Sequence, residues 1–276
     1  NGYNNDVITG QLNANYEFSK NFSFYIRSGV ITNFAFSTLN TPKSYIYYGN
    51  TEFEGNYSET RKNNFQIVTD ALLTYKTQFL TDFNLTASAG ASTRYNKNSY
   101  LSSRTNGLNV PTLYNLDNTV GPVVSVDRLA ERKINSLFGY FDVDYKQMIF
   151  LGGTWRRDYT TTLQKPNNSY AYPSASLGII PTNMVHFPEF ISFVKLRASW
   201  ASVSTDKIEI NDDPDEGIYR DWYATLPVFA PGPRWNGNNA SLNLPGLLIK
   251  EGLKPNKTIS QEYGAEIRFL KNRLGL

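Results

Sequence analysis

The stretch from Asp6 to Val30, DVITGQLNANYEFSKNFSFYIRSGV, decides the fold that the sequence predicts. Apolar side chains occupy every second position from Ile8 to Phe18, with Gly10 as the one gap. After the polar triplet at 19–21, the same alternation resumes over 22–26. A period of two marks a β-strand, because successive side chains point to opposite faces of a sheet. We therefore predict two long antiparallel strands joined by a tight turn.

The same alternation recurs along the rest of the chain, so we predict about nine strands and the start of a tenth. The further segments are 65–79, 83–98, 135–147, 149–160, 174–180, 194–200 and 258–270, and a turn at 271–273 leads into the last strand. A medium connection over 181–190 has room for a short helical turn. No helical period interrupts the pattern, which indicates an all-β protein and excludes an α/β fold.

The connections between these strands run short, long, short, long, short, long, medium, long and short. The long ones cover 37–64, 96–133, the region around 161–173, and 204–257. In an antiparallel sheet, alternate connections lie at opposite ends. The short turns therefore gather at one end and the long loops at the other, which is typical of outer-membrane barrels with short periplasmic turns and long extracellular loops.

Composition sets limits on the class of protein. The chain has 276 residues, a net charge of +3 and a mean hydropathy of −0.42, and it contains no cysteine. The small charge, without a basic run, gives no support for a nucleic-acid partner. No run of about 18 apolar residues occurs, which excludes a transmembrane helix but not a transmembrane barrel. Without cysteine there is no disulfide, zinc-thiolate or thiol-nucleophile chemistry.

An alternating strand fits two environments. In a soluble sandwich the apolar face packs inward, whereas in a membrane barrel it meets lipid and the polar face lines the lumen. Several segments here alternate for about a dozen residues, as in membrane strands, which need about nine to eleven. The apolar face also carries the small row Ala87, Ala89 and Ala91, with aromatic residues near strand ends, as at membrane interfaces. We therefore predict that this face contacts lipid.

From Phe138 to Leu276 the chain resembles the C-terminal barrel region of SusC/RagA-type TonB-dependent transporters of Bacteroidota. The stretches that carry the resemblance are GYFDVDYKQMIFLGGTWRRDYT, YAYPSASLGIIPTN, FVKLRASWASVSTD and LKPNKTISQEYGAEIRFLKNRLGL. Two details depart from the family pattern, with Ile179 in place of the usual Trp and Trp200-Ala201 in place of Tyr-Gly. Residues 1–137 share only the general pattern of alternating strands with the family, without matching motifs.

The resemblance implies a barrel of about twenty-two strands, closed by an N-terminal plug and driven through TonB. It also implies a SusD-like surface lipoprotein as partner, and import of oligosaccharides or peptides. The chain opens on Asn1 without a signal sequence and stops where a strand begins. We therefore expect residues 1–276 to be part of one transmembrane β-barrel domain, about nine to ten strands of the larger barrel, with plug and signal regions outside this chain.

Candidate site residues fall into two groups. Charged side chains that alternate with the apolar positions are predicted to face the lumen or the plug: Arg94, Asp142, Asp144, Arg156, Asp158 and Arg197. Aromatic residues in the two long loops are candidates for stacking on a ligand: Tyr45, Tyr47, Tyr48, Trp222, Tyr223 and Trp235. The alternative for these aromatic residues is packing against other loops or anchoring a lid protein.

Metal binding has one candidate. Asn211, Asp213 and Asp215 are spaced by two and precede Gly217, so their oxygens are candidates for a structural calcium site. The glycine is displaced from the EF-hand pattern, and the alternative is a solvated acidic loop tip. His186 is the only histidine, which gives no basis for His-based catalysis or metal binding; we expect it to be a structural residue at the periplasmic end.

The sequence thus predicts TonB-dependent import of nutrients across the bacterial outer membrane, without a cofactor. No catalytic motif occurs, so an enzyme is not predicted. Two alternatives stay open: a passive porin or structural barrel, and a soluble glycan-binding surface β-protein.

Overall fold

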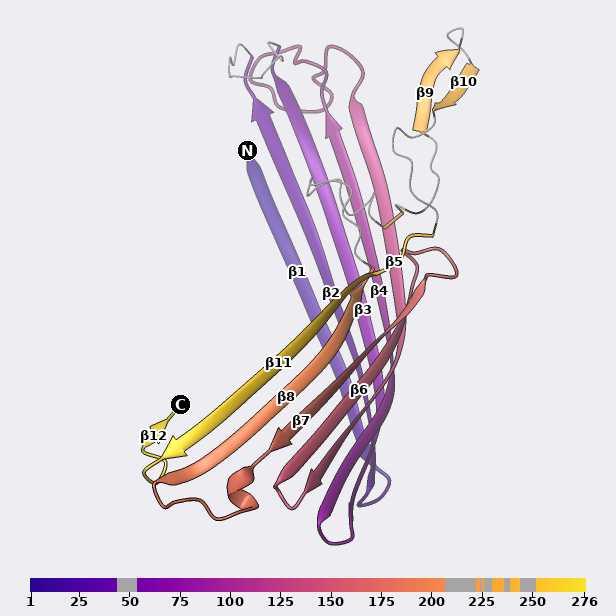
Figure 1. The fold of residues 1–276 in the computed structure, drawn as a ribbon. Helices are drawn as coiled ribbons and strands as arrows, with labels where there is room; N and C mark the ends of the chain where they lie inside the picture. The colour runs from indigo at the N-terminus through magenta and orange to yellow at the C-terminus, as the bar shows by residue number, and fades with distance from the viewer. Residues whose placement is uncertain (44–53, 207–221, 224, 226–229, 236–238, 244–251) are drawn as a thin grey trace.

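The main feature of the computed structural model is one antiparallel sheet of ten strands (Figure 1). The structure describes residues 1–43, 54–206, 222–223, 225, 230–235, 239–243 and 252–276. The strands of this sheet are β1 (Gly2–Glu17), β2 (Phe22–Thr41), β3 (Asn56–Phe79), β4 (Phe83–Arg104), β5 (Val124–Tyr145), β6 (Ile149–Thr160), β7 (Ser169–Ile179), β8 (Ile191–Thr205), β11 (Asn256–Phe269) and β12 (Leu274–Gly275). They lie side by side in chain order, as in a meander.

Two smaller elements accompany the sheet. A separate hairpin pairs β9 (Ala230–Trp235) with β10 (Asn239–Asn243), inside the longest predicted loop. The medium connection between β7 and β8 holds the short 3₁₀ turn η1 (Pro181–Asn183), as expected. None of the helical segments among the described residues has the length and apolarity needed to cross a bilayer.

The central strands are longer than the alternation predicted. β2 continues to Thr41 and β4 to Arg104, and β5 already begins at Val124, inside segments that the sequence indicated as loops. The backbone pairing there is unbroken, for example from Leu129 opposite Ser99 to Val124 opposite Arg104. Both faces of these extensions carry polar residues, so the alternation fades while the ladder of backbone hydrogen bonds persists.

The two ends of the sheet differ as predicted (Figure 1). The short β1–β2, β3–β4 and β5–β6 turns lie at one end, and the long connections lie at the other. In the β5–β6 turn, Lys146 and Gln147 have φ values of 51° and 57°, and the Met148 N–H donates to the Tyr145 carbonyl at 2.8 Å. Two consecutive left-handed residues are the geometry of a type I′ hairpin turn.

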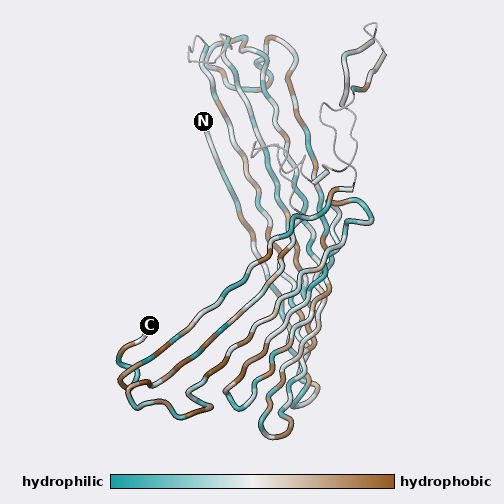
Figure 2. The backbone as a smooth tube through the Cα atoms, in the orientation of Figure 1, coloured by the Kyte–Doolittle hydropathy of each residue, from teal (hydrophilic) through white to brown (hydrophobic). Residues whose placement is uncertain are grey.

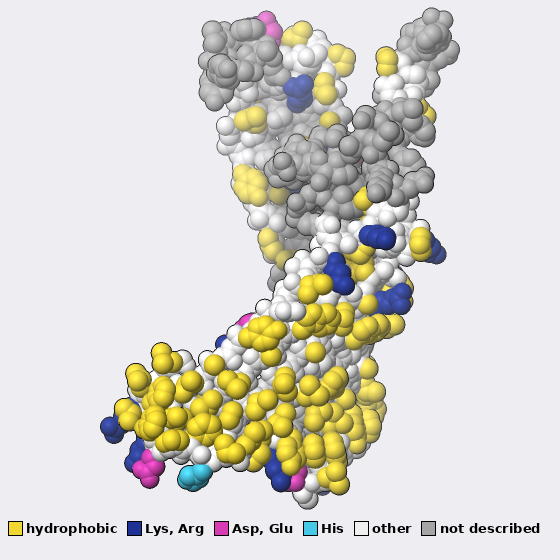
Figure 3. Space-filling view, viewed as in Figure 1, with side chains coloured by type: hydrophobic (Ala, Val, Ile, Leu, Met, Phe, Trp, Pro, Cys, Tyr) yellow, Lys and Arg dark blue, Asp and Glu magenta, His cyan; other side chains and the backbone are white. Residues whose placement is uncertain are grey.

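The pairing register gathers the apolar positions on one side of the sheet, which we call the apolar face. Ala87 of β4, for example, lies opposite Tyr75 on one neighbour and Phe141 on the other. Large side chains on this face are widely exposed even on central strands, with 53% exposure at Leu137 and 44% at Leu73. Within the described residues no second layer covers them. Figure 3 shows this face over β7, β8 and β11 as a continuous hydrophobic surface.

This apolar surface forms a band in the half of the sheet nearer the short turns (Figure 2). On β4 it runs from Phe83 to Ala91, the length of about nine residues that a tilted strand needs to cross a bilayer. Beyond it, polar pairs take over the same face, beginning with Thr93, which donates to the Asn135 Oδ1 at 2.9 Å. The band therefore has the height of a membrane, as predicted for a lipid-facing surface.

Aromatic side chains line the band near the short turns. Phe83 stacks on Phe79 at 5.1 Å between ring centroids and contacts Tyr145 at 4.6 Å, and Phe22 contacts Tyr75 at 4.6 Å. His186 lies at the same end, in the connection between β7 and β8 (Figure 1). Aromatic girdles at this level are a property of transmembrane barrels.

Buried apolar residues, in contrast, lie near the loops. The described ones are Leu108, Ala130, Ile134, Leu163, Tyr170 and Ile180. Most of them belong to loop segments or to the parts of β5 and β7 near the long loops. The described residues therefore form no hydrophobic core of the soluble-sandwich kind, since only these few apolar side chains among them are buried.

Candidate functional site

The opposite side of the sheet, which we call the polar face, carries all six of the predicted charged residues. Asp142 lies opposite Thr86, and Asp144 lies opposite Asn84. Each of these pairs is one residue away from an apolar pair, so the side chains point to the opposite face. The register places Arg94, Arg156, Asp158 and Arg197 on this face too. The structure divides them between residues that have protein partners and residues that have none within the described ranges.

One cluster on the polar face joins three strands around Asp70. Arg27 of β2 donates from Nη2 to the Asp70 Oδ2 at 2.7 Å, and the Ser92 hydroxyl of β4 donates to the other carboxylate oxygen at 2.6 Å. Sequence reasoning did not single out Arg27 or Asp70. Alternation places both on the polar face, but the pairing that sets them opposite each other depends on the register of β2 and β3.

A second cluster surrounds Arg156 on β6. Its Nε donates to the Asp158 Oδ1 at 2.8 Å and its Nη2 donates to the Ser136 hydroxyl at 2.8 Å. The guanidinium also lies over the rings of Phe138 and Tyr172, with the carbon 5.7 Å and 5.9 Å from the two ring centroids. The Tyr172 hydroxyl in turn donates to Asp158. This charge pair is satisfied within the barrel wall.

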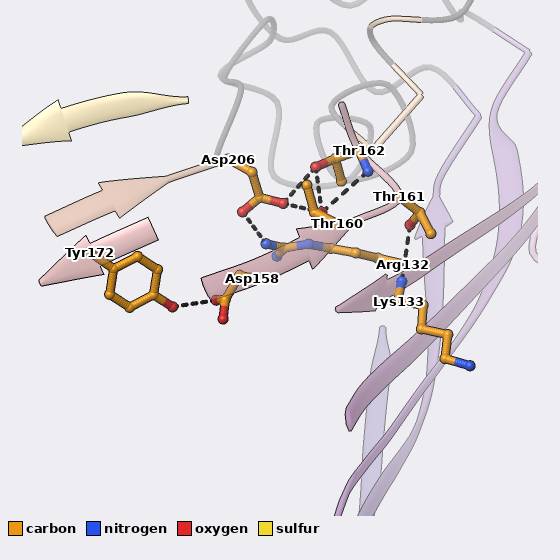
Figure 4. Close-up of polar contacts among 8 residues, drawn as sticks. All are labelled: Arg132, Lys133, Asp158, Thr160, Thr161, Thr162, Tyr172 and Asp206. Carbon is orange, nitrogen blue, oxygen red and sulfur yellow. Dashed lines mark hydrogen bonds and ion pairs between the residues drawn. The ribbon is translucent and has the colours of Figure 1, made fainter. Parts of the chain in front are cut away.

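A third cluster, the Asp206 cluster, lies where β8 meets the longest connection (Figure 4). Arg132 donates from Nη2 to the Asp206 Oδ1 at 2.5 Å, and the hydroxyls of Thr160 and Thr162 donate to Oδ2, the latter at 2.5 Å. The Asp206 side chain is 3% exposed. The cluster thereby joins the ends of β6 and β8 to β5. It also links the beginning of the β6–β7 connection to the beginning of the connection that follows β8.

The electrostatics of this cluster follow from its geometry. Burial by itself raises the pKa of Asp206, but the hydrogen bonds from Thr160 and Thr162 and the charge of Arg132 outweigh that effect, so the pKa lies below its ordinary value. A lowered pKa in the folded state means that the ionised carboxylate contributes stability above the ordinary carboxyl pKa. This contribution is lost as the pH falls through the folded-state pKa.

We therefore expect the stability of the loop end to be constant near neutral pH and to fall only under acidic conditions. In urea unfolding of the whole protein, the difference between wild type and Asp206→Asn should be unchanged from about pH 7 to pH 5 and should shrink below about pH 4, the ordinary range for a carboxyl group. A difference that stays constant down to pH 3 would contradict this assignment.

A hollow of about 420 Å³ on the polar face holds the charged residues without partners. Asp142, Lys195, Arg197 and Glu262 line it, and within the described part of the chain none of the four has a hydrogen bond or ion pair. Glycine makes room for them: a Cβ on Gly264 would lie 2.4 Å from the Arg197 Nε. Two cations and two carboxylates thus stand unengaged around one depression.

The remaining predicted charges have simpler surroundings. Arg94 is exposed and borders a second hollow of about 530 Å³, together with Arg27 and Gln66. Asp144 accepts from the Asn84 side-chain amide at 3.1 Å and from the Gln147 backbone at 3.3 Å, so it supports the β5–β6 turn.

The aromatic candidates are only partly described. Trp222 and Tyr223 are half-buried, and the Glu131 N–H of β5 donates to the Tyr223 hydroxyl at 2.9 Å. The Tyr223 hydroxyl therefore contacts the backbone of β5. Trp235 ends β9, but its side chain lies outside the described part, as do the residues Tyr45, Tyr47, Tyr48, Asn211, Asp213 and Asp215.

These features define a class of protein. A meandering sheet with a lipid-height apolar band, a polar opposite face and loops of unequal length at its two ends is a segment of an antiparallel transmembrane β-barrel. The chain thus has the antiparallel, all-β fold of a membrane barrel that its sequence predicted.

Comparison with solved structures agrees. The chain is similar to the RagAB peptide transporter, with a TM-score of 0.78 and 15% identity over 99% of this chain. It is also similar to the siderophore receptor PiuA from Acinetobacter baumannii (TM-score 0.54, 12% identity) and to the ferric-catecholate import receptor Fiu from E. coli (TM-score 0.52, 11% identity), each over 99% of this chain. No family model and no curated protein matches the sequence.

At these identities the likeness establishes the fold, and it agrees with the barrel that the resemblance implied. The chain spans 30% of the RagAB transporter chain and 39% and 40% of the two receptor chains. The chain therefore matches only part of each of these structures. By their descriptions, the similar proteins are a peptide transporter and two receptors, one for a siderophore and one for ferric-catecholate import.

Proposed function

We propose that this chain is the barrel part of a SusC-type, TonB-dependent transporter that imports peptides or oligosaccharides together with a SusD-like lipoprotein. The observation that carries the proposal is the difference between the structural likenesses. The chain matches the peptide transporter with a TM-score of 0.78 and the siderophore receptors with 0.54 and 0.52, at the same coverage. This favours a nutrient importer of the former type, without enzymatic activity, over a siderophore receptor.

The unpartnered charges on the polar face support a plugged rather than an open barrel. Asp142, Lys195, Arg197 and Glu262 present both signs of charge within one hollow, where a plug could pair with them. Arg156 and Asp158, by contrast, neutralise each other within the wall. We propose that the four residues of the hollow, with Arg94, face the plug or the solute that passes it. The Arg156 and Asp70 clusters would keep the wall rigid during transport.

At the loop end, we propose capture of the ligand by aromatic side chains beneath the lipoprotein. Trp222 and Trp235 belong to the longest connection, and aromatic rings can stack on sugar rings or anchor a protein lid. Tyr223 contributes less to ligand contact in this proposal, because its hydroxyl is engaged by β5. After capture, rearrangement of the plug would open the polar lumen to the solute.

Uptake by cells that carry the whole gene tests this function. Radiolabelled peptide and oligosaccharide mixtures should enter cells that express the complete protein with its lipoprotein partner, and deletion of TonB should reduce entry to the background of the gene deletion. Entry that persists without TonB would instead identify a passive barrel, the remaining alternative.

The ligand role of the loop residues has its own test in the same cells. Trp222→Ala with Trp235→Ala should weaken ligand binding by about tenfold, since one aromatic contact contributes about 0.5–1.5 kcal/mol. Asp127→Ala, an exposed change at the same end of the barrel, serves as the control. Unchanged affinity in the double variant would dismiss both tryptophans as ligand contacts.

A further inference from the structure

Two cations lie on the outward side of the sheet towards the long loops, Arg157 at the border of the hydrophobic band and Lys133 four residues beyond Leu137 along β5. Arg157 of β6 lies opposite Leu137, two positions beyond Trp155 on the same face. Lys133 of β5 lies opposite Tyr95 of β4. Both are exposed, and Figure 3 shows basic side chains along this upper border of the hydrophobic surface. This places positive charge on the outside of the barrel.

Neither cation has a carboxylate partner in the part of the chain that the structure describes. The Arg157 Nη2 donates to the Ser169 hydroxyl at 3.0 Å and its guanidinium lies 5.4 Å from the centre of the Tyr159 ring, but it has no carboxylate partner among the described residues. The Lys133 side chain has no partner there either. Figure 4 shows its ammonium directed away from the Asp206 cluster.

The nearest outward carboxylate is already engaged. Glu131 lies two positions from Lys133 on the same face and pairs with Lys97 at 3.7 Å. It also accepts a hydrogen bond from the Tyr95 hydroxyl at 2.9 Å. The carboxylate is therefore shared between two other groups, and the outward surface above the band retains an excess of positive charge around Arg157 and Lys133.

The level of these residues on the strands identifies the chemistry they would meet. The hydrocarbon of the bilayer covers the apolar band, so its head groups lie at the border where Trp155, Arg157 and Tyr159 follow one another outward. This border belongs to the long-loop end, where the outer leaflet lies. A planar guanidinium matches the oxygens of a phosphate with two parallel hydrogen bonds, and an ammonium adds a point charge.

We propose that Arg157 and Lys133 form a binding site for the phosphate groups of an acylated, phosphorylated glycolipid in the outer leaflet. The apolar band beside them takes the acyl chains, and Trp155 and Tyr159 contact the region between the acyl chains and the head group. The occupant is a lipid rather than a free anion, because the site is continuous with the lipid-covered surface. This site is independent of the transported solute and of TonB.

The test uses the full-length protein in detergent and native mass spectrometry. Bisphosphorylated lipid A should bind more tightly than the same lipid A with its phosphates removed. Arg157→Gln with Lys133→Gln should lower the affinity for the bisphosphorylated form by about thirtyfold, since each basic residue contributes about 1 kcal/mol to binding an anionic lipid surface. The dephosphorylated lipid should bind both proteins equally.

A matched variant separates the site from general charge. Lys20→Gln with Lys271→Gln removes two cations at the short-turn end, and it should leave the affinity for lipid A unchanged. Retention of the folded barrel in every variant is checked by its heat-dependent mobility in gels. Three results would overturn the proposal: equal binding of dephosphorylated lipid A, an unchanged affinity in the Arg157 and Lys133 variant, or displacement of the lipid by millimolar inorganic phosphate.

Discussion

Replacing Ala87 with arginine will lower the free energy of unfolding of the barrel from lipid vesicles by about 2–4 kcal/mol, the cost of a basic residue near the bilayer midplane on the lipid face. Ala87 lies midway along the apolar run of β4, between Tyr75 and Phe141 on the neighbouring strands. A charge at this position loses its water without gaining a partner. Urea titration of the whole protein in phospholipid vesicles, followed by tryptophan fluorescence, measures the effect.

Two controls isolate the role of lipid. Thr86→Arg places the same side chain one residue away on the polar face, beside Asp142, and should cost less than about 1 kcal/mol. Ala87→Leu adds bulk without charge and should leave stability unchanged or raise it, because lipid accommodates the extra volume. If Thr86→Arg were the more damaging change, the assignment of lipid to the apolar face would be wrong.

Removing the Asp206 carboxylate will destabilise the loop end by about 3–5 kcal/mol, the cost of breaking a buried ion pair from one side. In Asp206→Ala, Arg132 keeps its charge in a largely buried position, and the hydroxyls of Thr160 and Thr162 lose their acceptor. Faster hydrogen exchange at the long-loop ends of β5, β6 and β8, with the band half of the sheet unchanged, would report this loss.

A second substitution separates the cost of leaving the Arg132 charge unpaired from the cost of losing the hydrogen bonds of Thr160 and Thr162. Adding Arg132→Met to Asp206→Ala removes the unpaired charge and should recover most of the stability, since an apolar pair often replaces a buried ion pair without cost. Asp127→Ala removes an exposed carboxylate at the same end and should change stability by less than about 0.5 kcal/mol. Failure of the double variant to recover would show that the hydrogen bonds of the two threonines carry the stability.

Sequence reasoning found the strands of the membrane band because their pattern is local. Within Phe83–Ala91 successive side chains point alternately to lipid and to the polar side of the sheet. The alternation of apolar and polar residues therefore follows directly from the two environments. The same reasoning ended the strand that begins at Phe83 too early, at residue 98 instead of Arg104, since water on both sides removes the contrast on which it relies. It placed a turn near Gln147, between the two strands, but it did not predict the left-handed backbone at Lys146 and Gln147, because this turn carries neither glycine nor asparagine.

The candidate site depended more on tertiary structure. Alternation indicated which charged residues share the polar face, but it did not separate the paired Arg156 from the unpaired Arg197. The decisive contacts join distant segments: Arg27 meets Asp70 across 43 positions and Arg132 meets Asp206 across 74. Such meetings depend on strand register and on where loops return to the sheet.

The amino-acid sequence by itself determined that this chain is a meander of membrane-height strands with short turns at one end and long loops at the other, because each strand records the solvent on its two faces. Only the tertiary structure decided which charges neutralise one another and which, among the described residues, lie on either face of the sheet without an ion-pair partner. These outcomes are set by the alignment of neighbouring strands, and no single strand contains that information.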